Sequence, residues 1–170
     1  GRKDFYEGLA FSLAGMMATP KFLFVIDSTE PDPSNKGSER LTGYARASRL
    51  SFLLWNSTPD DLLLKAAENG DLYSKAGLEK QVARMIASPN LDAGVRAFFS
   101  DFLDIEKFET VEKDPIIYPA FGVKAVEDAK EQLLRTVVDH LVTRDQDYRD
   151  IFTTRHTFVT GNLGRIYNLA

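Results

Sequence analysis

Apolar residues along most of this chain recur every three or four positions, which is the spacing of one face of an α-helix. The pattern predicts helices at residues 4–18, 41–55, 59–68, 78–86, 91–108, 120–142, 148–152 and 162–169. Alternation of apolar and polar residues, which is typical of a strand, never persists beyond five residues. We therefore predict an all-α fold, an irregular bundle of six to eight helices.

Residues 28–39 interrupt the helical pattern with the sequence STEPDPSNKGSE, which has no large apolar residue. Pro, Ser, Asp and Gly at this density predict one long loop. We interpret it as a linker between the tail of a preceding helical module, residues 1–27, and a main helical module, residues 40–170. The apolar run 22–26 is expected to be either a buried extended segment or a brief helix packed on a core. Because the chain opens on Gly1 rather than Met and enters a helical pattern at once, we expect a piece of a longer protein.

Three predicted helices carry enough apolar residues to suggest which of their faces are buried. The buried stripe predicted for residues 41–55 consists of Leu41, Tyr44, Ala45, Ser48, Phe52 and Trp55, widened by Leu53 and Leu54. The face predicted for residues 91–108 is unusually aromatic, with Val95, Phe98, Phe99, Phe102, Leu103 and Ile105. The long helix has an inner stripe of Val126, Ala129, Leu133, Val137 and Leu141. On its outer side, Glu131 and Arg135 are spaced to pair at i,i+4.

The segment STPDD at residues 57–61 is typical of the start of a helix. A hydroxyl residue, Ser57 or Thr58, is the expected N-cap, and Pro59 suits the first turn. Asp60 and Asp61 then lie where the helix dipole favours negative charge, which explains them better than catalysis does. Asn69-Gly70 predicts a left-handed stop at the other end of this helix.

Composition narrows the classes of function. The chain has 170 residues, with 21 Lys and Arg against 25 Asp and Glu, for a formal charge of −4. Interspersed signs and an acidic balance argue against a nucleic-acid partner. No apolar run reaches the roughly 18–20 residues of a transmembrane segment. The absence of cysteine excludes disulfides, thiolate nucleophiles and a covalently attached c-type haem within this chain, so we expect no cofactor and no metal here.

The chain has only two histidines, and no catalytic constellation is visible. Metalloprotease, P-loop, nucleophile-elbow and dinucleotide motifs are all missing. His140 falls on or beside the inner stripe of the long helix, where an axial ligand or a proton-transfer group is one interpretation. A hydrogen bond to a neighbouring carbonyl or acid is the favoured one. His156 lies in a loop and is the second weak candidate for cofactor binding.

Two sets of charged residues are candidate sites. Arg49 lies on an otherwise apolar helix, so we expect it to meet a buried or half-buried acid, with Glu131 as one possible partner. A structural ion pair is favoured over an anion-binding site. The second set is an acidic group made up of Asp101, Asp104, Glu106 and Glu109. Paired carboxylates could bind calcium or perform acid–base chemistry on a sugar. A solvent-exposed acidic flank is favoured, because the spacing of these residues does not place all four on one helix face.

Residues 41–61, LTGYARASRLSFLLWNSTPDD, resemble the opening of a helical module of unknown function with the pattern A-S-R-L-S-(Y/F)-x-L-W-x-S-x-P-D. That module is abundant in large exported proteins of planctomycete type, where it accompanies c-type cytochrome domains. The matching positions include Arg49, Trp55, Pro59 and Asp60. Glu131 falls where the module carries a glutamate on its long helix.

The resemblance extends to both ends of the chain. Thr157-Phe158-Val159 and Tyr167 resemble the closing stretch of the module. Upstream, TPKFLF at residues 19–24 resembles the end of the neighbouring module that usually precedes it. The similarity thus covers the tail of one module and almost all of the next.

This resemblance implies a periplasmic or extracellular bacterial location, a multi-module parent, and c-type haem carried by other segments of that parent. Our leading hypothesis is a non-catalytic helical scaffold or docking module whose partners are other modules or subunits of the parent protein. The alternative is part of a multi-module redox enzyme acting on a polysaccharide-like or other extracellular substrate. Carbohydrate binding is a third possibility, with Trp55, Tyr118 or Tyr148 as exposed stacking platforms.

Overall fold

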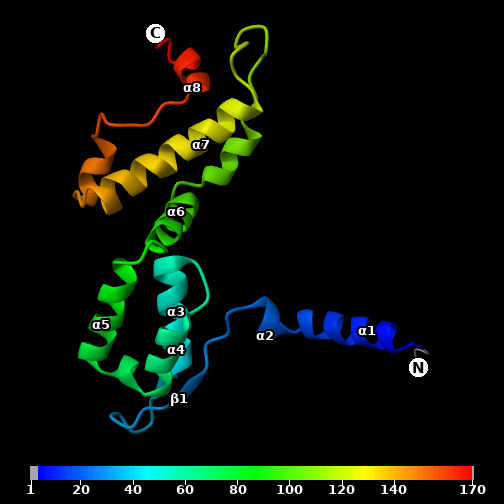
Figure 1. The fold of residues 1–170 in the computed structure, drawn as a ribbon, viewed down its shortest axis with the longest axis vertical. Coiled ribbons are helices and arrows are strands. Elements are labelled where there is room, and N and C mark those ends of the chain that lie inside the picture. Colours follow the sequence, from blue (N-terminus) through cyan, green and yellow to red (C-terminus); the bar gives the residue numbers. More distant parts are fainter. Residues whose placement is uncertain (1–3, 170) are drawn as a thin grey trace. The chain divides into compact units, whose positions relative to one another are not determined.

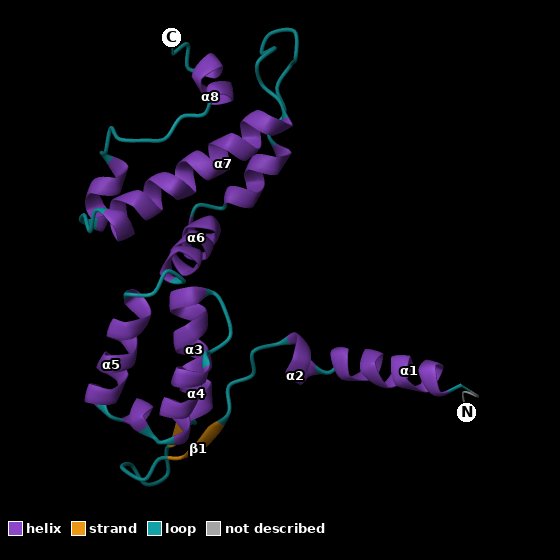
Figure 2. Ribbon diagram, viewed as in Figure 1, coloured by secondary structure: helices purple, strands orange, loops and turns teal. Residues whose placement is uncertain are grey.

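The structure of the protein is a computed structural model, and the residues it describes are 4–169. The described residues divide into two compact units, here called the N-terminal unit (residues 4–50 and 59–80) and the C-terminal unit (residues 51–58 and 81–169). Helices dominate both, as Figures 1 and 2 show, and the predicted all-α class is confirmed. Among the described residues, no helix is both long enough and apolar enough to cross a membrane.

The N-terminal unit contains two small strands and the first helices. Its elements are α1 (Phe5–Met17), α2 (Pro20–Leu23), β1 (Thr29–Pro31), β2 (Glu39–Leu41), α4 (Asp61–Glu68) and η1 (Asp71–Tyr73). Helices α3 (Gly43–Trp55) and α5 (Lys75–Ile86) begin in this unit and end in the other. The C-terminal unit adds α6 (Leu91–Phe102), η2 (Ile105–Thr110), α7 (Val123–Val138), η3 (Asp139–Thr143), η4 (Tyr148–Phe152) and α8 (Gly161–Ile166).

The segment predicted to be a loop forms the turn and one strand of a small antiparallel hairpin, drawn in orange in Figure 2. Thr29 pairs with Leu41, and Glu30 pairs with Arg40. The Arg40 guanidinium donates from Nε to the Glu30 carboxylate at 2.8 Å, so the cross-strand pair is also charged. Strands of three residues are too short to show alternation, which is why the sequence pattern did not reveal them. Because residues 39–41 belong to β2, α3 begins two residues later than predicted.

Helix α3 buries its small residues rather than most of its large ones. Gly43, Ala47, Ser51 and Trp55 are buried at intervals of four positions. The predicted stripe was wrong for Tyr44, Phe52 and Leu53, and Leu53 is 67% exposed. Apolar residues occur around most of this helix, so periodicity alone did not single out the buried face.

A direct contact shows why small residues line the N-terminal end of that face. A Cβ atom on Gly43 would lie 2.6 Å from the Ala67 carbonyl oxygen, so α4 approaches the α3 backbone directly there. A larger side chain at position 43 would therefore force the two helices of the N-terminal unit apart.

The ends of α4 partly match the prediction. Asp60 is the N-cap, and its carboxylate accepts a hydrogen bond of 2.9 Å from the Leu63 backbone N–H. Ser57 or Thr58 was the wrong choice of cap, and Pro59 precedes the cap instead of opening the helix. A carboxylate cap also carries negative charge to the positive end of the helix dipole, which a hydroxyl does not. The predicted stop is confirmed, because Gly70 follows the helix with a left-handed φ of 78°.

The core of the C-terminal unit is drawn from several elements. It includes Trp55, Phe99, Ile105, Val137, Val138 and Leu163, all buried. The predicted aromatic face of residues 91–108 is wrong for Phe98 and Phe102, which are 54% and 56% exposed. Helix α6 ends at Phe102, and Asp104 then adopts a left-handed conformation with φ 52°. This turn rotates the following residues relative to the α6 helix, so residues 91–108 do not share one helical face.

The long helix spans most of its predicted range, as α7 followed by the π-helical turn η3. The buried residues of α7 are Ala125, Asp128, Val137 and Val138. Of the predicted inner stripe only Val137 is fully buried, while the other members are half-buried. The buried face of the helix thus includes the carboxylate of Asp128, although hydrophobic periodicity predicts that a charged residue faces the solvent.

Helices α1 and α2 differ from the other α-helices because none of their residues is buried. Phe5 is 75% exposed, and the run 22–26 is exposed as well. The expectation that residues 22–26 would be buried or packed on a core was therefore wrong. Residues 20–23 form the single turn of α2, which begins at Pro20 because proline suits the first helical position.

Candidate functional site

The last part of the chain runs antiparallel along α7, as the trace between η4 and α8 shows in Figure 1. The Thr157 and Thr136 hydroxyl oxygens lie 2.9 Å apart. One residue further on, the Phe158 ring lies 4.4 Å below the Arg135 guanidinium carbon. Thr160 then reaches Asp128, two turns closer to the start of α7. These contacts bring the closing stretch onto the helix that carries Glu131.

Asp128 is the buried anchor of this arrangement. Its Oδ2 atom accepts hydrogen bonds from the Thr160 hydroxyl at 2.7 Å and from the Asn162 side-chain amide at 3.0 Å. Lys124 Nζ lies 3.3 Å from the other carboxylate oxygen. The Thr160 hydroxyl, followed by Asn162 and Lys124, lowers the pKa of Asp128 below its ordinary value. Thr160 is also the N-cap of α8, so one carboxylate holds that helix against α7.

We predict that Asp128→Asn releases α8 and makes residues 161–169 more sensitive to proteolysis. A neutral amide oxygen accepts the hydrogen bonds of Thr160 and Asn162 more weakly than a charged carboxylate, and it no longer attracts Lys124. The lowered pKa gives a pH dependence of known sign. Stabilisation from Asp128 is complete above its unfolded-state pKa of about 4 and is lost as the pH falls through the lower folded-state pKa. Limited proteolysis and acid unfolding followed by circular dichroism measure both effects. Glu127→Gln is the matched control, since Glu127 is exposed, and an equal effect of the two variants would contradict the prediction.

Glu131 forms a structural link between α6 and α7. Both of its carboxylate oxygens accept from the Arg96 guanidinium, at 2.9 and 3.1 Å. Arg96 also donates from Nε to Asp92 at 2.7 Å. These two carboxylates, with Glu131 the stronger influence, raise the pKa of Arg96. The expected pairing of Glu131 with Arg135 is wrong, because Arg135 stacks on Phe158 instead.

His156 joins a second charged group on the same face. Asp139 accepts from Arg144 Nε at 2.7 Å, and His156 Nδ1 lies 3.8 Å from the same carboxylate. An Arg144 nitrogen also lies 2.7 Å from His156 Nε2. A pocket of about 290 Å³ opens beside this group, lined by Asp92, Arg96, Arg135, Val138, Asp139, Thr143 and Phe158. The π-helical turn places Asp139 and Thr143 at the pocket wall, and such turns are frequent at functional sites.

His140 has the structural role that was favoured from the sequence. Its ring is buried, and Nε2 lies 2.9 Å from the Asp147 carbonyl oxygen. The hydrogen bond closes the loop between η3 and η4 and leaves the ring inside the C-terminal unit. His140 and His156 therefore have separate environments, and within the described residues no three His, Cys, Asp or Glu side chains gather as a metal site.

Arg49 pairs with Asp27 and not with Glu131, so the suggested partner was wrong. Arg49 Nε donates to the two Asp27 carboxylate oxygens at 2.9 and 3.1 Å, and a second guanidinium nitrogen completes the bidentate pair. The hydrogen bonds from Arg49 lower the pKa of Asp27, and those to Asp27 raise the pKa of Arg49. The expectation of an ion pair with an acid is confirmed. The guanidinium itself is largely exposed.

Trp55 is a core residue. It is 4% exposed, and its indole Nε1–H donates to the Met85 carbonyl oxygen at 3.0 Å. Trp55 is thus removed as a carbohydrate-stacking platform, whereas Tyr118 and Tyr148 are exposed. The acidic group is solvent-exposed at all four positions, as favoured from the sequence. Two of its members form ion pairs with lysines, Asp104 with Lys107 and Glu109 with Lys130.

Comparison with known families supplies the classification. The family model described as PSD4, a protein of unknown function (DUF1592), matches residues 41–169. The chain belongs to the PSD4 family. The resemblance to a helical module of unknown function is therefore confirmed. No curated protein and no solved structure matches the chain significantly.

The PSD4 match runs from the end of β2 through α8. It includes Trp55, Glu131 and the closing stretch on α7, so the motif positions named above lie within it. Helices α1 and α2, with their exposed apolar residues, lie outside the matched range. The structure thus assigns the Trp55 and Glu131 positions of this family member to packing and to an ion pair.

The PSD4 region also exposes two pairs of aromatic side chains. They are Phe98 and Phe102 on α6, which were expected to be buried, and Tyr148 and Phe152 on η4, each about half exposed or more. The Phe98 and Phe102 rings stack with centroids 5.9 Å apart, and Tyr148 meets Phe152 edge to face at 5.8 Å. Two phenylalanines four positions apart were the available signal, but the same spacing is also typical of a buried helix face.

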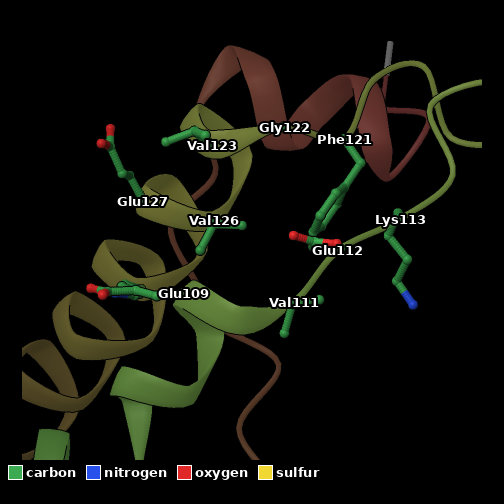
Figure 3. A pocket seen from close by; sticks show the side chains of 10 residues that line it. Glu109, Val111, Glu112, Lys113, Phe121, Gly122, Val123, Val126 and Glu127 are labelled. Carbon is green, nitrogen blue, oxygen red and sulfur yellow. The ribbon is translucent and has the colours of Figure 1, made fainter.

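A pocket of the PSD4 region lies between the start of α7 and the loop that follows η2, and we call it the Phe121 pocket (Figure 3). Its volume is about 580 Å³. Val111, Phe121, Val123 and Val126 form its apolar wall, and Glu109, Glu112, Lys113, Glu127 and Lys130 are its charged residues. In Figure 3 the Phe121 and Glu112 side chains extend into the space between the loop and α7. No local sequence pattern marked this cavity, because its walls come from separate segments of the chain.

Proposed function

We propose that this chain is a scaffold and docking module of a larger exported, cytochrome-associated protein, and that α1 and α2 form its docking element. The observation that carries the proposal is the exposure of every large apolar residue between positions 5 and 26. They are Phe5, Tyr6, Leu9, Phe11, Leu13, Met16, Met17, Phe22, Leu23, Phe24, Val25 and Ile26. Contiguous apolar surface of this kind is typical of protein interaction sites.

The physical argument rests on the stability of α1 itself. An isolated helix of 13 residues is marginal in water, because helix nucleation costs more than the first hydrogen bonds return. Packing of an apolar face normally supplies the missing stability. Helix α1 has no buried residue, so a partner surface would both order the helix and cover its side chains. Apolar residues on several of its sides suit a partner that surrounds it, such as another helical module.

The resemblance of residues 41–61 to modules that accompany c-type cytochrome domains supports the remaining part of the proposal. The partner would then be another module or subunit of the same parent protein. A parent isolated from its native source is expected to show the Soret band of c-type haem. Absence of that band from the isolated parent protein would contradict the cytochrome association but not the docking role of α1 and α2.

We predict that a photoreactive residue at Leu13 cross-links to another module or subunit of the parent protein, since this position is half exposed on α1. Lys36, in the exposed turn of the hairpin, is the control position and is expected to give no such product. The measurement is mass spectrometry of the cross-linked parent. Equal products from both positions, or none from Leu13, would contradict docking through α1. Leu9→Lys with Leu13→Lys should abolish the association and keep the fold, because neither residue is buried.

A further inference from the structure

The Phe121 pocket combines an apolar wall with charged groups at its edge. Val111, Phe121 and Val126 present hydrocarbon from the loop on one side and from α7 on the other. The volume of about 580 Å³ lies within the range of about 300–1,000 Å³ that is usual for small-molecule sites. A ligand here would bury apolar atoms against these side chains, so the pocket suits a molecule with a hydrocarbon body.

Most of the charged residues around the pocket have a partner among the described residues, but one carboxylate does not. Glu109 accepts from Lys130 Nζ at 2.6 Å, and Glu127 accepts from Lys124 Nζ at 3.3 Å. These two carboxylates are therefore engaged by lysines. Lys113 points away from the pocket in Figure 3, and its ammonium nitrogen lies 5.8 Å from the centre of the Tyr118 ring.

Glu112 is the remaining charged residue of the pocket. It takes part in no hydrogen bond or ion pair with any of residues 4–169, and Figure 3 shows its side chain extending into the space that Phe121 also enters. An unpaired carboxylate attracts a cation, and the face of a phenylalanine ring does the same through its quadrupole. Both groups repel an anion, and both attract a neutral alcohol more weakly than a cation.

We propose that the Phe121 pocket binds a small organic ammonium cation, with the ammonium beside Glu112 and the Phe121 ring and the hydrocarbon body against Val111 and Val126. The bond is non-covalent and reversible. This site is separate from the docking element on α1 and α2, because it is built entirely from the C-terminal unit. Failure of one proposal therefore leaves the other in place.

The test is a titration of the full ¹⁵N-labelled chain with n-butylammonium, followed by nuclear magnetic resonance. We expect saturable shifts of the backbone signals of Glu112, Phe121 and Val126. Neutral n-butanol and anionic butyrate have the same hydrocarbon body and serve as ligand controls. Both should bind at least about threefold more weakly, which is the range of one exposed charge pair. Equal binding of butanol and butylammonium, or no saturable shift, would overturn the proposal.

Two variants make the assignment specific. Glu112→Gln removes the charge and should weaken butylammonium binding about threefold to fivefold, with butanol binding unchanged. Glu106→Gln is the matched control, because Glu106 is an exposed glutamate of η2 that does not line the pocket. Equal effects of the two variants would also overturn the proposal. Thermal unfolding of both variants checks that each remains folded.

The same chemistry is available from a free amine or from a lysine side chain of another protein. A second titration with N-acetyl-lysine methylamide distinguishes these sources. If it shifts the same signals as butylammonium, the pocket accepts a lysine side chain. If only butylammonium binds, the ligand is a free amine.

Discussion

Replacing Trp55 with alanine is expected to lower the free energy of unfolding by about 3–5 kcal/mol, the largest effect of any single substitution proposed for this protein. Trp55 is 4% exposed, so the change removes a large buried ring and leaves a cavity in the C-terminal unit. It also leaves the Met85 carbonyl oxygen without the indole donor at 3.0 Å. The measurement is urea unfolding followed by circular dichroism, because the variant has no tryptophan fluorescence.

Leu53→Ala on the same helix is the matched control. Leu53 is 67% exposed, and its truncation should change the free energy of unfolding by no more than about 0.5 kcal/mol. Trp55→Phe should give an intermediate loss, because a ring remains but the Met85 carbonyl loses its donor at a cost of about 1–3 kcal/mol. If Trp55→Ala lowers the free energy of unfolding no more than Leu53→Ala does, Trp55 is not a core residue and is again a candidate for carbohydrate stacking.

Replacing Gly94 with alanine is expected to destabilise the C-terminal unit, although the same change in an open helix is favourable. A Cβ atom at position 94 would lie 2.0 Å from the Leu54 carbonyl oxygen and 2.9 Å from the Trp55 backbone nitrogen. Both atoms belong to backbone, so α6 must move away from the end of α3. Such overpacking costs about 1–3 kcal/mol or more, which exceeds the roughly 0.5–1 kcal/mol that alanine gains over glycine in a helix.

The control for Gly94 is Gly15→Ala in α1, where nothing lies within 4 Å of the added Cβ atom. This substitution should raise the helical circular dichroism signal slightly and leave the unfolding midpoint of the C-terminal unit unchanged. The midpoint is measured by urea unfolding. Destabilisation by Gly15→Ala as large as that by Gly94→Ala, or an unchanged midpoint for Gly94→Ala, would show that close approach at Leu54 is not the reason for glycine at position 94.

The contacts of the candidate site residues could be predicted only partly from the sequence. Arg49 was expected to meet an acid because a guanidinium on an apolar helix needs a partner, and it does. Its partner is Asp27, which precedes the hairpin in the sequence, whereas Arg49 follows it. The spacing of residues along one helix cannot predict a pair so far apart in the sequence. Glu131 was identified as a motif position, yet its link to Arg96 required the packing of α6 on α7. The Phe121 pocket escaped notice for the same reason, since its walls come from a loop and from a helix.

Local features of the sequence were enough to determine the helical class, the approximate extent of α1, α4 and α7, and the stop at Gly70. These depend on residues within a few positions of one another, through apolar periodicity and a glycine with positive φ. The resemblance around Trp55 likewise indicated a helical module of unknown function, which the family match over residues 41–169 confirms.

Only the tertiary structure decided which faces are buried, which charges are paired and which apolar surface is left uncovered. Phe98 and Phe102 have the spacing of core residues but are exposed, whereas the carboxylate of Asp128 is buried and bonded to Thr160 and Asn162. The physical reason is that burial and pairing depend on what lies opposite a side chain. That neighbour comes from a distant part of the chain, so local periodicity cannot predict whether the contact forms.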